Sequence, residues 1–178
     1  GRAKFGARPA SWQRLEDKTV IDAVWDEAGL ARPPSQVVPA ERGALERAAA
    51  QLDAGRGTVW VPDNRQGFHG AAEALRWVRT PAQAELAAAY LAGRADTVRV
   101  TPFLEGIPCS IHGFVFPEHT LTLRPCEKLV LRRPGQMTLH YASAATFWDP
   151  PPADREAMRQ AARRLGDHLR EAVGYRGA

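Results

Sequence analysis

The chain has 178 residues, 44% of them hydrophobic and 25% charged, which is typical of one globular domain or of two small lobes sharing an interface. Its formal net charge is +4, but the arginines are spread from Arg2 to Arg176, which argues against a nucleic-acid partner. An anionic small molecule as the partner is compatible with this charge. No apolar run approaches the roughly 20 residues that span a bilayer, and the first residues do not form a signal peptide, so we expect no membrane association and a cytoplasmic protein.

The first third of the chain alternates helix and strand patterns. Residues 1–10 are basic and contain glycine and proline, which predicts an irregular lead-in. From Ser11 the apolar residues fall near one helical face, and Gly29 closes that helix as a C-cap. A strand at 35–38, a helix at 40–54 and a strand at 58–61 follow at short spacing. This alternation indicates an α/β or α+β fold.

The loop after the second strand contains two glycines three positions apart, Gly67 and Gly70. Glycine lets successive backbone N–H groups converge on an anion, and Arg65 and His69 would add charge or further donors. We therefore predict an anion-binding loop over residues 63–72. A mobile surface loop without a ligand is the alternative.

A strand at 74–79 and a helix at 81–92 lead to two β-prone runs, 98–104 and 109–116, separated by a turn-forming break. Pro102 cannot donate a ladder hydrogen bond, so the first run must leave regular pairing there and expose backbone groups on its neighbours. A purine edge needs one donor and one acceptor from such a segment, while Phe103 and Leu104 could contact a ring face. The alternative is a hairpin with a proline-made bulge and no ligand.

The remaining residues predict further strands and one long helix. The strands are expected at 121–123, 124–133 and 137–141, and the helix from about Ala153 to Gly174. Ser110 and His112 share one face of their strand, but no strand-turn-helix elbow surrounds the serine, so a hydrolase nucleophile is not implied. The only cysteines, Cys109 and Cys126, lack metal-site spacing, and we predict two free thiols and no metal site.

The phrase Pro-Phe-Leu-Glu-Gly-Ile-Pro-Cys-Ser-Ile-His-Gly at residues 102–113 resembles the adenine hinge of the ATP-grasp superfamily, of the carboxylate–amine ligase type. That resemblance implies that the backbone of Pro102 to Leu104 binds adenine and that Glu105 contacts the ribose. The Asp17-Lys18 pair ahead of Ala28-Gly29 is similar to the segment that carries the family's first phosphate-binding lysine. Lys18 is thus a candidate phosphate ligand, with a solvated surface lysine as the alternative.

By the same resemblance the loop with Gly67 and Gly70 would close over the phosphates. His112 would face the nucleotide or the acceptor substrate, and Glu127 and Arg132 would point into the cleft. The family usually has a lysine at the end of the strand before the glycine-rich loop, where this chain has Val61-Pro62-Asp63, so Arg65 would have to substitute for it.

The resemblance predicts an α+β ATP-grasp-like fold with a small lobe at 11–79 and a second lobe at 80–178, carrying the hinge hairpin and the C-terminal helix, with ATP between them. The strands that bear the family's magnesium-binding acids would follow Gly174-Tyr175-Arg176-Gly177, so we expect a segment of a longer protein, incomplete at its C-terminus. The implied cofactors are ATP and Mg²⁺, and the implied substrates are a small carboxylate and an amine.

The implied activity is ATP-dependent ligation through an acyl phosphate, with the catalytic residues left unassigned. A degenerate ATP-grasp fold acting as a non-catalytic nucleotide-binding or interaction module is the first alternative. An anion-binding α/β protein outside this superfamily is the second.

Overall fold

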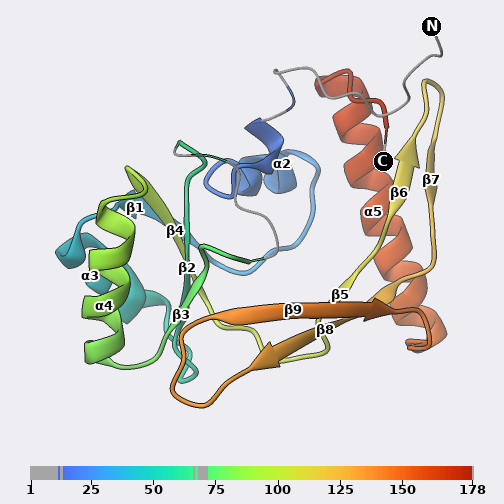
Figure 1. Cartoon of the computed structure of the whole chain (residues 1–178). Helices are drawn as coiled ribbons and strands as arrows, with labels where there is room; N and C mark the ends of the chain where they lie inside the picture. Colours follow the sequence, from blue (N-terminus) through green and yellow to red (C-terminus); the bar gives the residue numbers. More distant parts are fainter. Residues whose placement is uncertain (1–11, 13, 66, 68–71, 178) are drawn as a thin grey trace, which may run out of the picture.

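The computed structural model describes residues 12, 14–65, 67 and 72–177. The predicted lead-in at 1–10 therefore lies outside the described residues. The elements, in chain order (Figure 1), are η1 (Arg14–Glu16), α2 (Ile21–Glu27), β1 (Gln36–Pro39), α3 (Arg42–Leu52), β2 (Thr58–Pro62), β3 (Arg76–Val78), α4 (Pro81–Ala92), β4 (Thr97–Pro102), β5 (Cys109–Ser110), β6 (Gly113–Val115), β7 (Thr120–Thr122), β8 (Cys126–Arg132), β9 (Leu139–Ala145) and α5 (Pro152–Ala172). Helices and antiparallel sheets together make an α+β fold, which confirms the predicted class.

The first half of the chain forms a four-stranded antiparallel sheet in the order β1-β4-β2-β3. Helices α3 and α4 lie against one face of it (Figure 1). Because strand side chains alternate between faces, Trp60, Val98 and Val100 all point toward these helices and are fully buried with Leu45 and Leu91. These residues are the main hydrophobic core.

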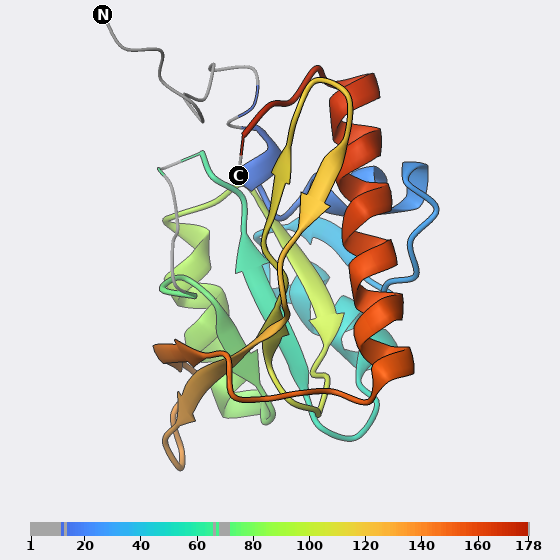
Figure 2. The same ribbon diagram turned by 90° about the vertical axis from the view of Figure 1, so that its right-hand side faces the viewer.

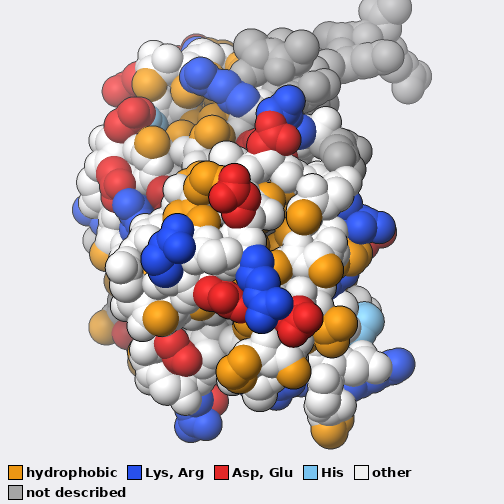
Figure 3. Space-filling view, turned by 90° about the vertical axis from the view of Figure 1, so that its left-hand side faces the viewer, with side chains coloured by type: hydrophobic (Ala, Val, Ile, Leu, Met, Phe, Trp, Pro, Cys, Tyr) orange, Lys and Arg blue, Asp and Glu red, His pale blue; other side chains and the backbone are white. Residues whose placement is uncertain are grey.

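Local signals explain the position of α4. Pro81 occupies the first turn, where its missing N–H costs nothing, and the Thr80 hydroxyl caps the helix by accepting from the amide of Gln83 at 3.3 Å. The outward side of α3 and α4 carries acidic and basic side chains interspersed with apolar ones (Figure 3). Arg42 there pairs with Glu46 at 2.8 Å and with Glu85 at 3.5 Å.

The second half of the chain contains a three-stranded sheet, β5-β8-β9, and the two-stranded sheet β6-β7. Helix α5 runs along β6 and β7 (Figure 2), and its buried Gly166 lies so close to Thr120 that an added Cβ would be 2.4 Å from the threonine methyl carbon. An isolated antiparallel bridge joins Val115 of β6 to Gly177. A mostly apolar cavity of about 550 Å³ lies between the β6-β7 sheet, α2 and α5.

The two halves meet where the turn between β8 and β9 contacts β3 and α4. The amide of Trp77 donates to the carbonyl of Met137 at 2.7 Å, and the Arg79 guanidinium donates to the carbonyl of Gln136 at 2.9 Å. Met137 packs against the core of the first sheet. The turn at 133–138 therefore fixes the second half of the chain against the first.

Several predicted elements differ from the structure in their connections. The helix expected from 11 to 29 is interrupted, because the Asp17 side chain accepts from both the amide and the hydroxyl of Thr19 and holds a turn between η1 and α2. The expected hinge hairpin is absent from the described residues: β4 belongs to the four-stranded sheet, whereas β5 pairs with β8. The alternative of a hairpin with a proline-made bulge fails for the same reason.

The sheet pairing also bears on the predicted division at residue 79. Helix α4 and strand β4 both pack with the first sheet, so that unit continues to about residue 103. Among the described residues, none of the helices is both long and apolar enough to cross a membrane.

Candidate nucleotide-binding face

The candidate site lies on the face of the four-stranded sheet that is turned away from α3 and α4. Alternation from the buried Trp60 and Val98 places Val59 and Val61 of β2 and Arg99 of β4 on this other face. Cross-strand partners share a face, and Val61 pairs directly with Arg99. The open face thus carries a charged group in the middle of β4, between Thr97 and Thr101.

The predicted hinge begins where β4 leaves the sheet. The amide of Phe103 still donates to the carbonyl of Gly57 at 2.9 Å, which continues the pairing with β2. On the other side of β4, the register that sets Gln36 opposite Val100 brings Pro34 opposite Pro102, and neither proline has an N–H. The hydroxyl of Thr101 bonds the carbonyl of Pro34 at 3.2 Å and confirms that the segments are adjacent.

These pairings leave two backbone groups open at the hinge. No hydrogen bond among the described residues ends on the carbonyl of Pro102 or starts at the amide of Leu104. In an extended segment, the carbonyl of one residue and the amide two positions later point to the same side. The predicted hinge therefore contains one unpaired acceptor and one unpaired donor side by side, at the edge where β1 has ended; Pro102 is buried and Leu104 is exposed.

Aromatic rings and guanidinium groups cover this end of the sheet. The Phe103 ring stacks on Trp77 with centroids 4.1 Å apart and an interplanar angle of 19°. Arg132, from the end of β8, lies 5.1 Å from the Phe103 centroid, and Arg79 lies 4.3 Å from that of Trp77. The predicted site residues Phe103 and Arg132 are thus brought together.

The two residues that follow Phe103 are exposed. Leu104 is 63% exposed and presents an apolar side chain beside the open backbone groups. Glu105 forms an ion pair with Arg56 at 3.2 Å, and both side chains are largely in solvent. Its carboxylate lies at the hinge, as the prediction of a ribose contact requires, but it already has a basic partner.

Asp63 anchors the loop with Gly67 to the start of β4. Its carboxylate is 3% exposed and accepts from the amide and hydroxyl of Thr97, at 2.8 and 2.9 Å, and from the amides of Asp96 and Arg65, at 3.1 and 3.2 Å. Its own amide donates to the carbonyl of Thr97 at 3.0 Å. A buried carboxylate satisfied by four donors fixes where the loop leaves the sheet.

The loop itself is described only in part. Arg65 forms an ion pair with Asp96, so its charge already has a partner. Gly67 is exposed and has a φ of +127°, a conformation that favours glycine, and nothing lies within 4 Å of the position a Cβ would take. The predicted residues His69 and Gly70 lie outside the described residues.

Lys18 lies in the exposed turn between η1 and α2, close to the base of the same loop. The second carboxylate oxygen of Asp17 accepts from the amide of Asn64 at 3.2 Å, which joins this turn to the residue after Asp63. The predicted phosphate lysine and the predicted phosphate loop are therefore neighbours, although they are more than 40 residues apart in sequence.

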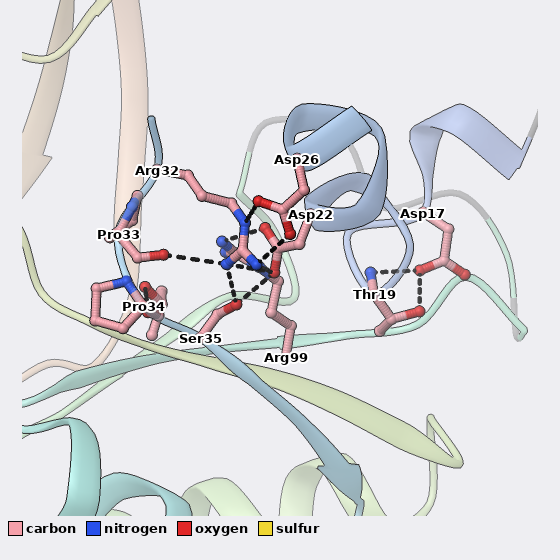
Figure 4. Close-up of polar contacts among 10 residues, drawn as sticks. Asp17, Thr19, Asp22, Asp26, Arg32, Pro33, Pro34, Ser35 and Arg99 are labelled. Carbon is pink, nitrogen blue, oxygen red and sulfur yellow. Dashed lines mark hydrogen bonds and ion pairs between the residues drawn. The ribbon is translucent and has the colours of Figure 1, made fainter. Parts of the chain in front are cut away.

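A network of charges holds α2 over the open face of the sheet (Figure 4). Asp22 accepts from Nε and Nη2 of Arg99 at 2.7 and 2.8 Å and from the hydroxyl of Ser35 at 2.5 Å, and Arg32 lies 3.8 Å away. Arg32 also bonds Asp26 through two nitrogens. Burial acts to raise the pKa of Asp22, but the hydrogen bonds from Arg99 and Ser35 and the nearby positive charges outweigh it and hold that pKa below its ordinary value.

The remaining predicted residues lie in the second half of the chain. His112 is exposed, and its Nε2 is 3.3 Å from the hydroxyl of Ser110, which in turn lies 3.2 Å from the thiol of Cys126. Glu127 and Arg132 are five positions apart on β8, and the extra residue in this pairing lies on β9, so the two side chains leave β8 on opposite faces. Of the two, Arg132 is the residue that faces Phe103.

The described residues do not supply a magnesium site. Across the described ranges, no group of three or more His, Cys, Asp and Glu side chains could hold a metal ion. The Mg²⁺ implied by the ATP-grasp resemblance therefore does not fit the residues present, and no step is assigned to it here.

Four residues of the site were not singled out from the sequence: Asp22, Asp63, Trp77 and Arg99. Arg99 gives a visible signal, since Val98-Arg99-Val100 places a charge between two apolar β-branched residues. Asp22 lies in the helical pattern of 11–29 without any local hint of a partner 77 residues away.

The chain has an ATP-grasp-like α+β fold, and several solved structures share it. The chain superposes on the ADP complex of PurK, N5-carboxyaminoimidazole ribonucleotide synthetase, with a TM-score of 0.70 at 12% identity, over 88% of this chain and 38% of that one. It also matches the VanG D-Ala:D-Ser ligase of Enterococcus faecalis, with a TM-score of 0.69 at 14% identity, over 89% of this chain and 46% of that one.

A third similar structure is the D-alanine-D-alanine ligase of Coxiella burnetii, with a TM-score of 0.68 at 14% identity, covering 93% of this chain and 43% of that chain. The chain thus spans less than half the length of these ligases, and at such identities the likeness shows the fold alone. No protein-family model matches the chain, and neither does any curated protein.

Proposed function

We propose that this chain binds ATP on the open face of the four-stranded sheet, with adenine at Pro102–Leu104 and the phosphates toward Lys18 and the loop containing Gly67. The observation that carries this proposal is the pair of open backbone groups at the hinge, the carbonyl of Pro102 and the amide of Leu104. The amino group of adenine is a donor and the adjacent ring nitrogen is an acceptor, so their pattern is complementary to this pair. Guanine presents the opposite pattern and would meet acceptor with acceptor.

We further propose that the chain is the nucleotide-binding part of a carboxylate–amine ligase. Transfer of the γ-phosphoryl group to a carboxylate would give an acyl phosphate, which the amine would attack with release of phosphate. Such chemistry depends on positioning and on charge stabilisation and needs no covalent enzyme nucleophile. Ligases and synthetases among the similar solved structures support the class of reaction, while the carboxylate and the amine are not identified by any residue of this chain.

A specific observation favours the alternative of a non-catalytic nucleotide-binding module. Two of the cations near the predicted phosphate end, Arg65 and Arg99, are ion-paired with acids of the chain itself, Asp96 and Asp22. A ligand phosphate must compete with these carboxylates. The two functions differ in a direct measurement: a ligase consumes ATP when a carboxylate and an amine are both supplied, and a binding module does not.

Two substitutions at Leu104 test the hinge. Leu104→Pro removes the amide donor, and the matched control Leu104→Ala keeps the donor and removes the side chain; at 63% exposure, both should be accommodated by the fold. Loss of a hydrogen bond worth about 1 kcal/mol weakens binding by roughly fivefold to tenfold. In isothermal titration we expect both variants to lose the apolar contact of the Leu104 side chain, and the proline variant to bind ATP a further fivefold to tenfold or so more weakly than the alanine variant, because only proline removes the amide donor.

Comparison of ATP with GTP on the native chain completes the test, with preference for ATP expected. Absence of ATP binding by the native chain would refute the proposed function. Equal affinities of the two variants would show that adenine, if bound, is not read by this amide.

A further inference from the structure

Strand β4 connects the two ends of the proposed nucleotide site. Thr97 at its start is bonded to Asp63 at the base of the loop, and Pro102 at its end begins the hinge. At about 3.3 Å per residue, these two ends are roughly 16 Å apart, and Arg99 lies about 10 Å from Pro102. A nucleotide that extended along β4 from the proposed hinge toward the loop would pass Arg99, beside the helix α2 that bonds it.

Arg99 occupies the open face rather than the core. Its direct partner across β2 is Val61, and the Cβ atoms of such opposed residues are about 5 Å apart on the same side of the sheet. A cation at position 61 or at position 99 would therefore reach the same space. The chain places a valine at one of these positions and an arginine at the other.

The Arg99 guanidinium is oriented but not saturated. Asp22 holds Nε and Nη2 in a two-pronged contact, and the side chain of Arg99 is 15% exposed. An arginine has five N–H donors, so three remain after this contact, and no hydrogen bond or ion pair among the described residues uses Nη1. Asp22 is itself shared with Ser35 and Arg32, so its charge is divided between two guanidinium groups.

We propose, on the basis of the function proposed above, that Arg99 is the cation that binds the inner phosphates of the nucleotide and that Asp22 is its positioning residue. An arginine held by a carboxylate through one edge keeps its other edge available for phosphate oxygens at little further loss of side-chain entropy. If the pair has only a structural role and attaches α2 to β4, removal of both charges should leave the ratio of ATP to adenosine affinity unchanged.

The experiment compares the affinities of ATP and adenosine in the same variants, because only ATP reports on the phosphate contacts. Arg99→Ala would leave the carboxylate of Asp22 without its main partner, which destabilises the fold, so the main variant is Asp22→Asn/Arg99→Gln, which removes both charges and keeps similar shapes. We expect adenosine to bind this variant with the same affinity as the native chain. ATP should bind the variant at least about tenfold more weakly, because a hydrogen bond between charged groups is lost.

Addition of Val61→Lys to the double variant supplies the cation from the neighbouring strand. We expect it to recover most of the lost ATP affinity, with adenosine again unchanged. Thermal unfolding by circular dichroism confirms that each variant is folded.

Two results would overturn the assignment, and they are distinguishable. If the double variant retains the native ratio of ATP to adenosine affinity, Arg99 has a structural role only, and the proposed function stands. If the native chain binds neither adenosine nor ATP, the proposed function itself is refuted.

Discussion

Replacement of Asp63 by alanine should loosen the junction between the phosphate-side loop and the sheet and destabilise the whole fold. The carboxylate is 3% exposed and accepts four hydrogen bonds. After truncation, water can reach the amides of Arg65 and Asp96, which are exposed residues, so the two bonds from Thr97 carry most of the loss. Hydrogen bonds to a charged partner contribute about 1.5–3 kcal/mol each, so we expect these two bonds to lower the free energy of unfolding by roughly 3–6 kcal/mol.

Urea denaturation followed by circular dichroism measures this loss, and the midpoint of thermal unfolding should fall by about 6–24 °C for a chain of this size. The matched control is Asp96→Ala in the same cluster: its side chain is 58% exposed and its ion pair with Arg65 lies at the surface, so it should cost less than about 1 kcal/mol. Asp63→Asn keeps one acceptor oxygen for Thr97 and should fall between the two. A loss below about 1 kcal/mol for Asp63→Ala would refute the reasoning, because such a value is that of an exposed polar side chain.

Three further predictions test other parts of the structure. Gly166→Ala should destabilise the chain by about 1–3 kcal/mol through overpacking against Thr120, and a double-mutant cycle with Thr120→Ala should show that the two substitutions are not additive. The folded-state pKa of Asp22 is below its ordinary value of 3.8, so its contribution to stability is complete above pH 3.8 and is lost as the pH falls from there toward the folded-state pKa. In the variant Asp22→Asn, the free energy of unfolding should therefore fall less steeply at acid pH, as denaturation curves measured against pH would show. An unchanged acid dependence would contradict the assignment. Burial, with a smaller effect of Cys126, raises the pKa of the Cys109 thiol, and the charge of Lys128 opposes this shift. Iodoacetamide should therefore modify Cys109 more slowly in the folded chain than in urea, as mass spectrometry would show. Equal rates would be inconsistent with the raised pKa.

Local sequence signals were sufficient for most individual elements. The helix at 81–92 is found with the predicted bounds, because Pro81 and Thr80 mark its start. The strands expected at 58–61 and 98–104 are found at Thr58–Pro62 and Thr97–Pro102, since both runs are rich in β-branched residues. These features depend on neighbours within a few residues, which a sequence displays directly.

Connections between distant segments could not be predicted in the same way. The strand expected at 109–116 is divided into β5 and β6, which belong to different sheets, because their partners lie further along the chain. The turn at Asp17 that interrupts the first helix is held in part by Asn64, a contact that no local pattern encodes.

In the candidate site, too, local features could be predicted from the sequence and contacts between distant segments could not. The end of β4 at the proposed hinge could be predicted because Pro102 lacks an N–H, a property of the residue itself. The pairing of Arg99 with Asp22 could not, since it requires α2 to lie over β4, and neither segment indicates the other. Whether Lys18, Glu105 and His112 contact a ligand stays a prediction.

The two facing prolines at the edge of β4 have a consequence for association between molecules. Most unpaired strand edges can recruit a strand from another copy of the chain, because they offer alternating donors and acceptors. Here Pro34 and Pro102 remove two donors from the same short stretch, so an incoming strand would find its carbonyls unmatched. The edge at Pro34 and Pro102 is for that reason a poor template for intermolecular β-pairing, and the same imino acids that leave the proposed hinge unpaired also protect it from aggregation.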